Sequence, residues 1–220
     1  MSGIQTTTLE NGLRVVTDTV PSMHSVALGI WVGVGTRHEN LAQNGVAHMV
    51  EHMLFKGTKK RNAFEIAEEL ENVGASVNAY TSREITSYHV HLLSQDTQLG
   101  LDVMADMYLN STLPPEEIER ERGVILQEIG MSNDTPDDLV FDIYSETAYP
   151  KQSLGAPILG RAHNIEAMSQ QDLQGYIDEF YKPSNTVISA AGGFDHDEFV
   201  SQVRTLFAHQ TQSEASTYKA

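Results

Sequence analysis

Two kinds of hydrophobic pattern alternate along this chain, and together they restrict its fold more than any other feature. Strand patterns, which alternate or are rich in β-branched residues, occupy residues 6–9, 13–18, 25–35, 75–79, 85–93 and 186–191. Apolar residues at helical spacing predict helices over residues 45–55, 63–73, 96–110, 115–131, 137–148, 169–180 and 197–207. Strands that pair with near neighbours and are interleaved with helices predict an α+β fold, in which helices cover one face of a largely antiparallel sheet.

The length of 220 residues fits one large domain or two small ones. Residues 209–220 are polar and have no periodic pattern, so we interpret them as a linker-like tail and expect the folded unit to be residues 1–208. The N-terminus lacks the basic and apolar regions of a signal peptide, and no apolar stretch is long enough to span a bilayer. We therefore expect a cytoplasmic protein with no membrane partner.

Acidic residues dominate the composition: 30 Asp and Glu against 14 Lys and Arg give a formal net charge of -16. Nucleic-acid binding needs clustered basic side chains that contact phosphates, so the charge argues against a nucleic-acid partner. It is compatible with basic partners or substrates. The chain has no Cys, which excludes disulfides and thiolate metal ligands.

His48, Glu51 and His52 form an HxxEH sequence inside the helix predicted over residues 45–55. Residues four apart lie on one helical face, so both imidazoles can reach one metal ion. Glu51 adjoins His52 and would lie beside that ion, where a general base can deprotonate a metal-bound water. The alternative interpretation is two helix histidines with a solvent-facing glutamate.

A catalytic zinc site typically has three protein ligands and a water, so a carboxylate must come from elsewhere in the chain. The helix predicted over residues 115–131 offers Glu121 and Glu128, two turns apart on one face. Its apolar neighbours indicate that this part of the helix is buried, where a carboxylate is costly unless it is paired or bound to metal. A surface ion pair with Arg120 or Arg122 is the alternative for Glu121.

An HxxEH sequence followed by Glu128, 76 residues after His52, resembles the inverted-motif zinc peptidases of the pitrilysin and insulinase family, and within it the processing-peptidase branch. The matching segments are LENGLRVV, EHMLFKGT, GASVNAYTSRE, ERGVILQE and LGAPILG. The resemblance extends over residues 6–207. It implies the N-terminal, catalytic half-domain of a zinc metalloendopeptidase that hydrolyses extended or unfolded peptides, with Zn²⁺ as its cofactor.

The resemblance implies a role for each motif residue. His48, His52 and Glu128 would be the zinc ligands, Glu51 the base that activates water, and Glu121 a second acidic residue that orients water or a histidine. Two neutral imidazoles and one carboxylate would leave the site with a net charge near +1. The ion would then remain a Lewis acid.

The resemblance also implies a substrate-binding site. Asn78, Ala79 and Tyr80 match an edge strand to which an extended peptide adds as one more strand, although an ordinary hairpin is the alternative. Asp138 and Asp142 match acidic positions that receive an arginine just before the cleaved bond, although a solvated acidic helix face is the alternative.

Members of this branch have two homologous halves, and this chain corresponds to the first. The resemblance therefore implies a C-terminal homologous half or a partner subunit, besides a peptide substrate, and the acidic charge of the chain favours a basic peptide. We expect the chain by itself to bind zinc and to hydrolyse peptides poorly. The alternative function is a non-catalytic structural or partner subunit with the same fold. Relatives of that kind generally lose the metal residues, and the retention of all four here favours the enzyme.

Overall fold

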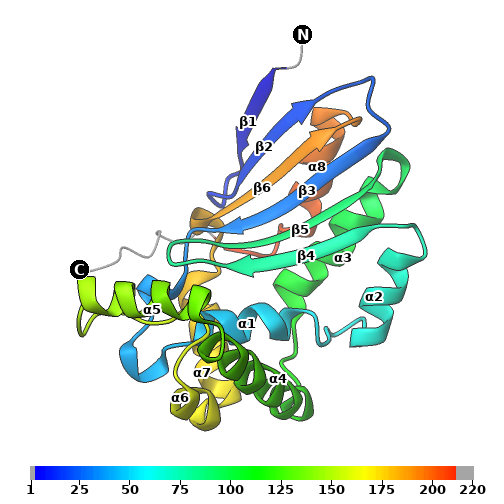
Figure 1. Ribbon diagram of the computed structural model, residues 1–220. Coiled ribbons are helices and arrows are strands. Elements are labelled where there is room, and N and C mark those ends of the chain that lie inside the picture. The colour runs from blue at the N-terminus through cyan, green and yellow to red at the C-terminus, as the bar shows by residue number, and fades with distance from the viewer. Residues whose placement is uncertain (1–2, 212–220) are drawn as a thin grey trace.

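A single sheet of six strands organises the computed structural model, which describes residues 3–211. The strands are β1 (Ile4–Thr8), β2 (Arg14–Thr19), β3 (Ser25–Val32), β4 (Ser76–Thr81), β5 (Thr86–Leu93) and β6 (Thr186–Gly192). Their order across the sheet is β1-β2-β6-β3-β5-β4 (Figure 1). β2 and β6 run parallel and the other neighbouring strands run antiparallel, which confirms the prediction of a largely antiparallel sheet.

The last strand of the chain, β6, lies in the middle of the sheet. Its Ile188 pairs with Val15 of β2 on one side and with Ile30 of β3 on the other, and all three side chains are fully buried. Burying such a side chain stabilises the fold by about 1.5–3 kcal/mol. The sheet therefore depends on contacts between the beginning and the end of the described chain.

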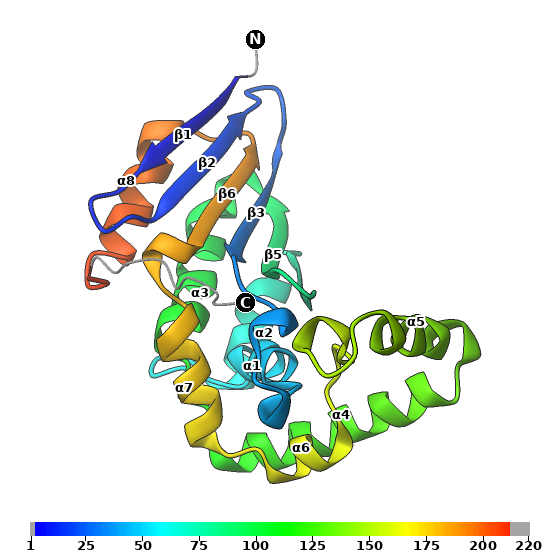
Figure 2. The ribbon, with the colours of Figure 1, turned by 90° about the vertical axis from the view of Figure 1, so that its left-hand side faces the viewer.

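Helices cover one face of the sheet, as predicted. They are α3 (Thr97–Asn110), which packs on β3 and β5, and α8 (His196–Leu206), which packs on β2 (Figure 2). The alternate residues Val26, Leu28, Ile30 and Val32 of β3 are all at most 1% exposed, as expected for the covered face of a strand.

The remaining helices gather mainly at one end of the sheet (Figures 1 and 2). They are α1 (Val46–Leu54), α2 (Ala63–Glu71), α4 (Pro115–Asn133), α5 (Pro136–Ala148), α6 (Ala162–Ala167) and α7 (Gln170–Phe180). The helix α1 contacts α4, α7 and the edge strand β4. This arrangement brings the HxxEH helix against both the helix that carries Glu128 and the edge of the sheet.

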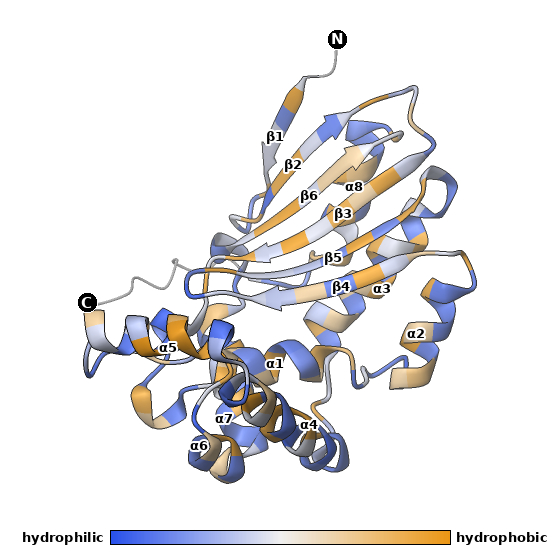
Figure 3. Cartoon of the chain, viewed as in Figure 1, coloured by the Kyte–Doolittle hydropathy of each residue, from blue (hydrophilic) through white to orange (hydrophobic). Residues whose placement is uncertain are grey.

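The helix α5 differs from the others because none of its residues is buried. Its apolar residues Val140, Phe141, Ile143 and Tyr144 are between 54% and 70% exposed, and the hydrophobic bands along α5 are visible in Figure 3. A helix with this apolar content normally buries one face. The described part of the chain leaves this face open.

The structure differs from the prediction at a few boundaries. Strand β3 ends at Val32 rather than residue 35, because the chain turns away from the sheet and Gly35 packs directly on the backbone of Ser82. The helix α6 was not predicted, since six residues hold too short a pattern. Residues 212–220 of the expected tail lie outside the described residues, so its boundary stays a prediction. No helix in residues 3–211 is long and apolar enough to cross a membrane.

Candidate metal and active site

The start of α1 is set by a buried carboxylate. Glu39 accepts hydrogen bonds from the backbone N–H groups of Gly45 and Ala47, at 3.0 and 2.8 Å, which would otherwise lack partners at a helix N-terminus. Gly45 has a φ of 102°, and a Cβ there would lie 2.9 Å from the Cα of Gly160. The glycines therefore let the LGAPILG segment pack closely against the first residues of α1, which fixes the position of the helix.

His48 and His52 lie one turn apart on α1, and their imidazoles point toward the same carboxylate of α4. The Nε2 atoms of His48 and His52 lie 3.7 and 3.9 Å from Oε2 of Glu128. Donor atoms around a tetrahedral zinc ion are about 3.4 Å apart, given zinc–ligand distances near 2.1 Å. In residues 3–211, these three residues are the group of His, Asp and Glu side chains close enough to share an ion, with ligand atoms within 4.8 Å of one another. The set has the composition of a zinc site, and its separations lie a little above those of ligands around a bound ion.

The protonation of His48 suits metal binding. Burial, together with the neighbouring His52, lowers the pKa of His48 to about 4, so its imidazole is neutral near pH 7. Its Nδ1 atom is buried without a hydrogen-bond partner, while Nε2 faces Glu128. A neutral imidazole that offers Nε2 is the form that coordinates a metal.

Glu121 lies behind His52 rather than at the surface. One carboxylate oxygen accepts a hydrogen bond from Nδ1 of His52 at 2.9 Å, and the other lies 2.8 Å from Nζ of Lys56. Burial by itself would raise the pKa of Glu121, but the hydrogen bonds and charges of Lys56 and His52 outweigh burial and lower it. Glu121 is therefore held as a carboxylate that orients His52 and leaves its Nε2 free for a ligand.

The alternative of a surface ion pair for Glu121 is wrong. Arg120 pairs with Glu117, and Arg122 pairs with Glu119, in each case three residues earlier on α4. The helix is also less buried than its apolar residues indicated, since Ile125 is fully buried but Val124 is 40% exposed.

Glu51 adjoins the three-residue group without belonging to it. Its Oε2 atom accepts a hydrogen bond of 2.5 Å from the hydroxyl of Thr81, the last residue of β4. Burial raises the pKa of Glu51, while the hydrogen bonds of Thr81 and the charge of His52 oppose that rise. A carboxylate held beside the group but not directed into it has the position expected for a general base.

The predicted substrate strand, β4, is one of the two edge strands of the sheet. Asn78 and Tyr80 are exposed and Ala79 is half-buried, on a strand that pairs only with β5 in the described sheet. The Oδ1 atom of Asn78 accepts the N–H of Ala79 at 2.8 Å. A peptide that used this N–H would have to displace the Asn78 side chain.

The predicted acidic pair lies on α5. Asp138 is exposed in the first turn, and Asp142 lies one turn further along the same helix. Asp142 is 3.8 Å from the guanidinium of Arg83, which also donates to the hydroxyl of Ser145 and to the carbonyl of Leu154. Burial raises the pKa of Asp142, and Arg83 opposes the rise. The chain's own Arg83 therefore already neutralises part of the predicted arginine-binding site.

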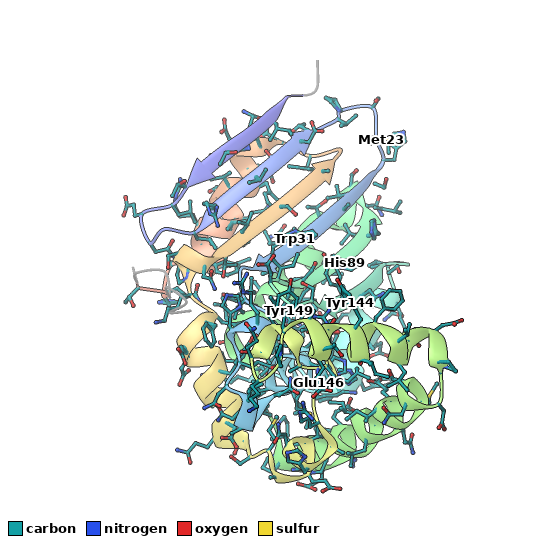
Figure 4. The ribbon with its side chains drawn as sticks, turned by 60° about the vertical axis from the view of Figure 1, so that its left-hand side comes forward. Met23, Trp31, His89, Tyr144, Glu146 and Tyr149 are labelled. Carbon is teal, nitrogen blue, oxygen red and sulfur yellow. The ribbon has the colours of Figure 1, made fainter. Side chains whose placement is uncertain are left out.

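Three rings line the uncovered sheet face next to Tyr80: Trp31, His89 and His91. Their centroid separations are 6.2 Å for Trp31 and Tyr80, 6.3 Å for Tyr80 and His89, and 6.1 Å for His89 and His91. Figure 4 shows Trp31 and His89 on the sheet and Tyr144 on α5, all drawn on the side facing the viewer. The edge strand is thus flanked by aromatic rings on the sheet.

Sequence reasoning missed Lys56 and Thr81. Lys56 follows His52 by four residues but lies beyond the end of α1 at Leu54, so helical spacing alone did not place it beside His52. The contact of Thr81 with Glu51 spans 30 positions and has no signature in the local pattern.

Comparison with known proteins now settles the family. The protein-family model described as Insulinase (Peptidase family M16) matches residues 14–162 of the sequence. The family model of the Peptidase M16 inactive domain matches residues 167–220. The chain belongs to the M16 peptidase family. This assignment agrees with the resemblance found in the sequence.

Members of the family among curated proteins are similar over nearly the whole chain. The uncharacterized zinc protease YmxG of Bacillus subtilis is 42% identical over 200 residues, which cover 91% of this chain and 49% of YmxG. The uncharacterized zinc protease SCO5738 of Streptomyces coelicolor is 41% identical over 204 residues, 93% of this chain and 44% of the relative. The M16 chain described here thus spans about half the length of these relatives.

Solved structures of proteases have the same fold. A protease from Helicobacter pylori aligns with a TM-score of 0.92 at 23% identity, covering 100% of this chain and 53% of that protein. A putative M16-like peptidase from Alicyclobacillus acidocaldarius aligns with a TM-score of 0.87 at 27% identity, covering 97% of this chain and 51% of that protein. The α+β architecture is therefore that of M16 peptidases.

Proposed function

We propose that this chain is the zinc-binding catalytic half of a metalloendopeptidase. One observation carries the proposal: two imidazoles and a carboxylate face a common point, and a separate carboxylate, Glu51, lies next to that point. The relatives named as zinc proteases support zinc as the metal. A structural subunit would need none of this arrangement, so it is the less favoured function.

The residues have distinct roles in the proposed reaction. His48, His52 and Glu128 hold the ion, and Glu121 fixes the ring of His52 through Nδ1. When bound, the zinc ion supplies a Lewis acid that lowers the pKa of a water molecule and polarises the peptide carbonyl. Glu51 takes up the proton of the attacking water and returns it to the leaving amine nitrogen as the peptide C–N bond breaks.

The substrate is proposed to lie along β4. Backbone hydrogen bonds to an edge strand hold an extended peptide without requiring a particular sequence. Asn78, Ala79 and Tyr80 would provide this edge, and Asp138 with Asp142 would attract an arginine side chain of the peptide. The formal net charge of -16 favours basic peptides in the same way.

A second homologous half is proposed to complete the enzyme. The relatives are about twice as long as the chain, and the open apolar face of α5 supports a larger assembly around the site. The half could be a further part of the same polypeptide or a separate subunit. We expect the isolated chain to bind zinc and to cleave peptides poorly.

The proposal is tested by measuring zinc content and peptide cleavage together. The chain should bind about one zinc ion, and His48→Ala and Glu128→Gln should each bind far less while remaining folded. Cleavage of an unstructured arginine-containing peptide should rise when a second half is supplied, for example the C-terminal half of YmxG. A chain that binds no zinc, or variants that bind as well as the parent, would contradict the proposal.

A further inference from the structure

The hydrogen bond between Thr81 and Glu51 joins the edge strand directly to the proposed base. Glu51 belongs to α1 and Thr81 is the last residue of β4, and the oxygen atoms are 2.5 Å apart. Residues 78–80, where the peptide is proposed to lie, come immediately before Thr81. One hydroxyl therefore links the strand that would hold the substrate and the carboxylate that would accept the proton.

The position of Thr81 is itself firmly fixed, because the turn that follows it is anchored. The backbone N–H of Ser82 donates to the carbonyl of Ile85 at 2.8 Å, and the Ser82 carbonyl accepts the N–H of Thr36 at 3.1 Å. The Ser82 hydroxyl in turn accepts the N–H of Ile85 at 3.1 Å. The guanidinium of Arg83 donates to the carbonyl of Leu154 at 3.1 Å. Thr81 therefore offers a hydroxyl from a rigid point rather than from a free loop.

The side chain of Glu51 needs such an anchor. A glutamate has three rotatable bonds, and a general base must lie within about 2.6–3.2 Å of the proton that it takes. The hydroxyl of Thr81 donates to Oε2, and the backbone of Thr81 adds a hydrogen bond to the same carboxyl group. Threonine is also β-branched, which restricts its χ1 angle, so the direction of its hydroxyl is set largely by its own backbone.

We propose that Thr81 is the positioning residue for Glu51, and that it holds the base in a fixed position relative to the substrate strand. The proposal rests on the proposed function. It assigns Thr81 an effect on turnover, with no part in holding zinc and no contact with the peptide side chains.

The test compares Thr81→Val, which keeps the shape but loses the hydroxyl, with Thr81→Ser, which keeps the hydroxyl. Thr6→Val, the same change at an exposed position of the opposite edge strand β1, is the matched control. Each protein is prepared with zinc and a second half, and kcat, KM, the zinc dissociation constant and the melting temperature are measured.

Thr81→Val should lower kcat about 10–100-fold, the range found when residues that support a metal site are changed, with KM and zinc affinity within about twofold of the parent. Thr81→Ser should recover most of the activity, and Thr6→Val should match the parent. An unchanged kcat in Thr81→Val would overturn the proposal. So would a Thr81→Ser variant as slow as Thr81→Val, or a loss explained by weaker zinc binding.

Failure of the proposed function gives a different result. If the parent protein with zinc and a second half cleaves no peptide, the function is wrong whatever the variants do. In that case a crystal structure of zinc-loaded Thr81→Val decides the positioning question. A displaced or disordered Glu51 side chain supports the role of Thr81, and an unmoved Glu51 overturns it.

Discussion

At the scale of single residues, the imidazole rings of the two histidines of α1 are held in different ways. The Nδ1 atom of His52 has a partner in Glu121, whereas the Nδ1 atom of His48 is buried without one. Counting Glu121 as an anion would reduce the net charge of a zinc-loaded site from +1 to zero. Lys56, 2.8 Å from Glu121, returns that charge to +1. Glu121 can therefore support His52 while the zinc-loaded site keeps a net positive charge.

Replacement of Glu121 tests this support. Glu121→Gln keeps the shape but removes the charge that faces Nδ1 of His52 and Nζ of Lys56, and we expect zinc to bind about 10–100-fold more weakly. Competition with a chelator of known affinity measures the change. Glu119→Gln, at an exposed position of α4, is the control and should bind zinc like the parent. Equal affinity in all three proteins would show that Glu121 has no influence on the metal site.

At the scale of elements, the position of α1 depends on Glu39, which is buried where the helix begins. Burial raises the pKa of Glu39 to about 7, against three hydrogen bonds that favour the carboxylate. Between pH 4.5 and about 7, the carboxyl is then protonated in the folded chain and ionised in the unfolded chain. The unfolded state binds fewer protons, so the contribution of Glu39 to stability falls as the pH rises through this window.

The pH dependence of unfolding measures this contribution. From pH 5 to pH 8 the parent chain should lose on the order of 3 kcal/mol more stability than Glu39→Gln, since one pKa unit corresponds to about 1.36 kcal/mol. Urea unfolding of both proteins without metal gives the difference, in which the other titrating groups cancel. Glu68→Gln, an exposed change on α2, should follow the parent. Equal pH slopes for the parent and Glu39→Gln would contradict the assignment.

A second element-scale contact ties the connection between α1 and α2 to α3. Arg61 bonds Asp102 at 2.6 Å and Asp106 at 2.9 Å, and Asp106 is only 2% exposed. Arg61→Met would leave the Asp106 charge buried with its main cation removed, which costs about 3–5 kcal/mol. Arg161→Met, which removes a surface pair with Glu146, should cost at most about 1 kcal/mol. Urea unfolding distinguishes the two, and similar small losses would mean that water reaches Asp106.

At the scale of the whole molecule, the features that could be predicted from the sequence are those set by residues close together along the chain. Every strand and the HxxEH helix follow local patterns, and the resemblance placed Glu128 because its spacing from His52 is characteristic. The placement of β6 between β2 and β3 has no local signature, since Ile188 meets Val15 only in the folded sheet. The pairing of Arg83 with Asp142 was likewise unpredictable, because it joins a turn to a distant helix.

Glu51 is assigned here as the base of a zinc peptidase, and its replacement by glutamine decides that assignment. Parent and Glu51→Gln are each completed with a second half, and zinc content and cleavage of an arginine-containing peptide are measured on the same samples. We predict that both proteins bind about one zinc ion and that only the parent cleaves the peptide. Equal cleavage by the two proteins, or an absence of zinc from the parent, would contradict the assignment of Glu51 as the base of a zinc peptidase.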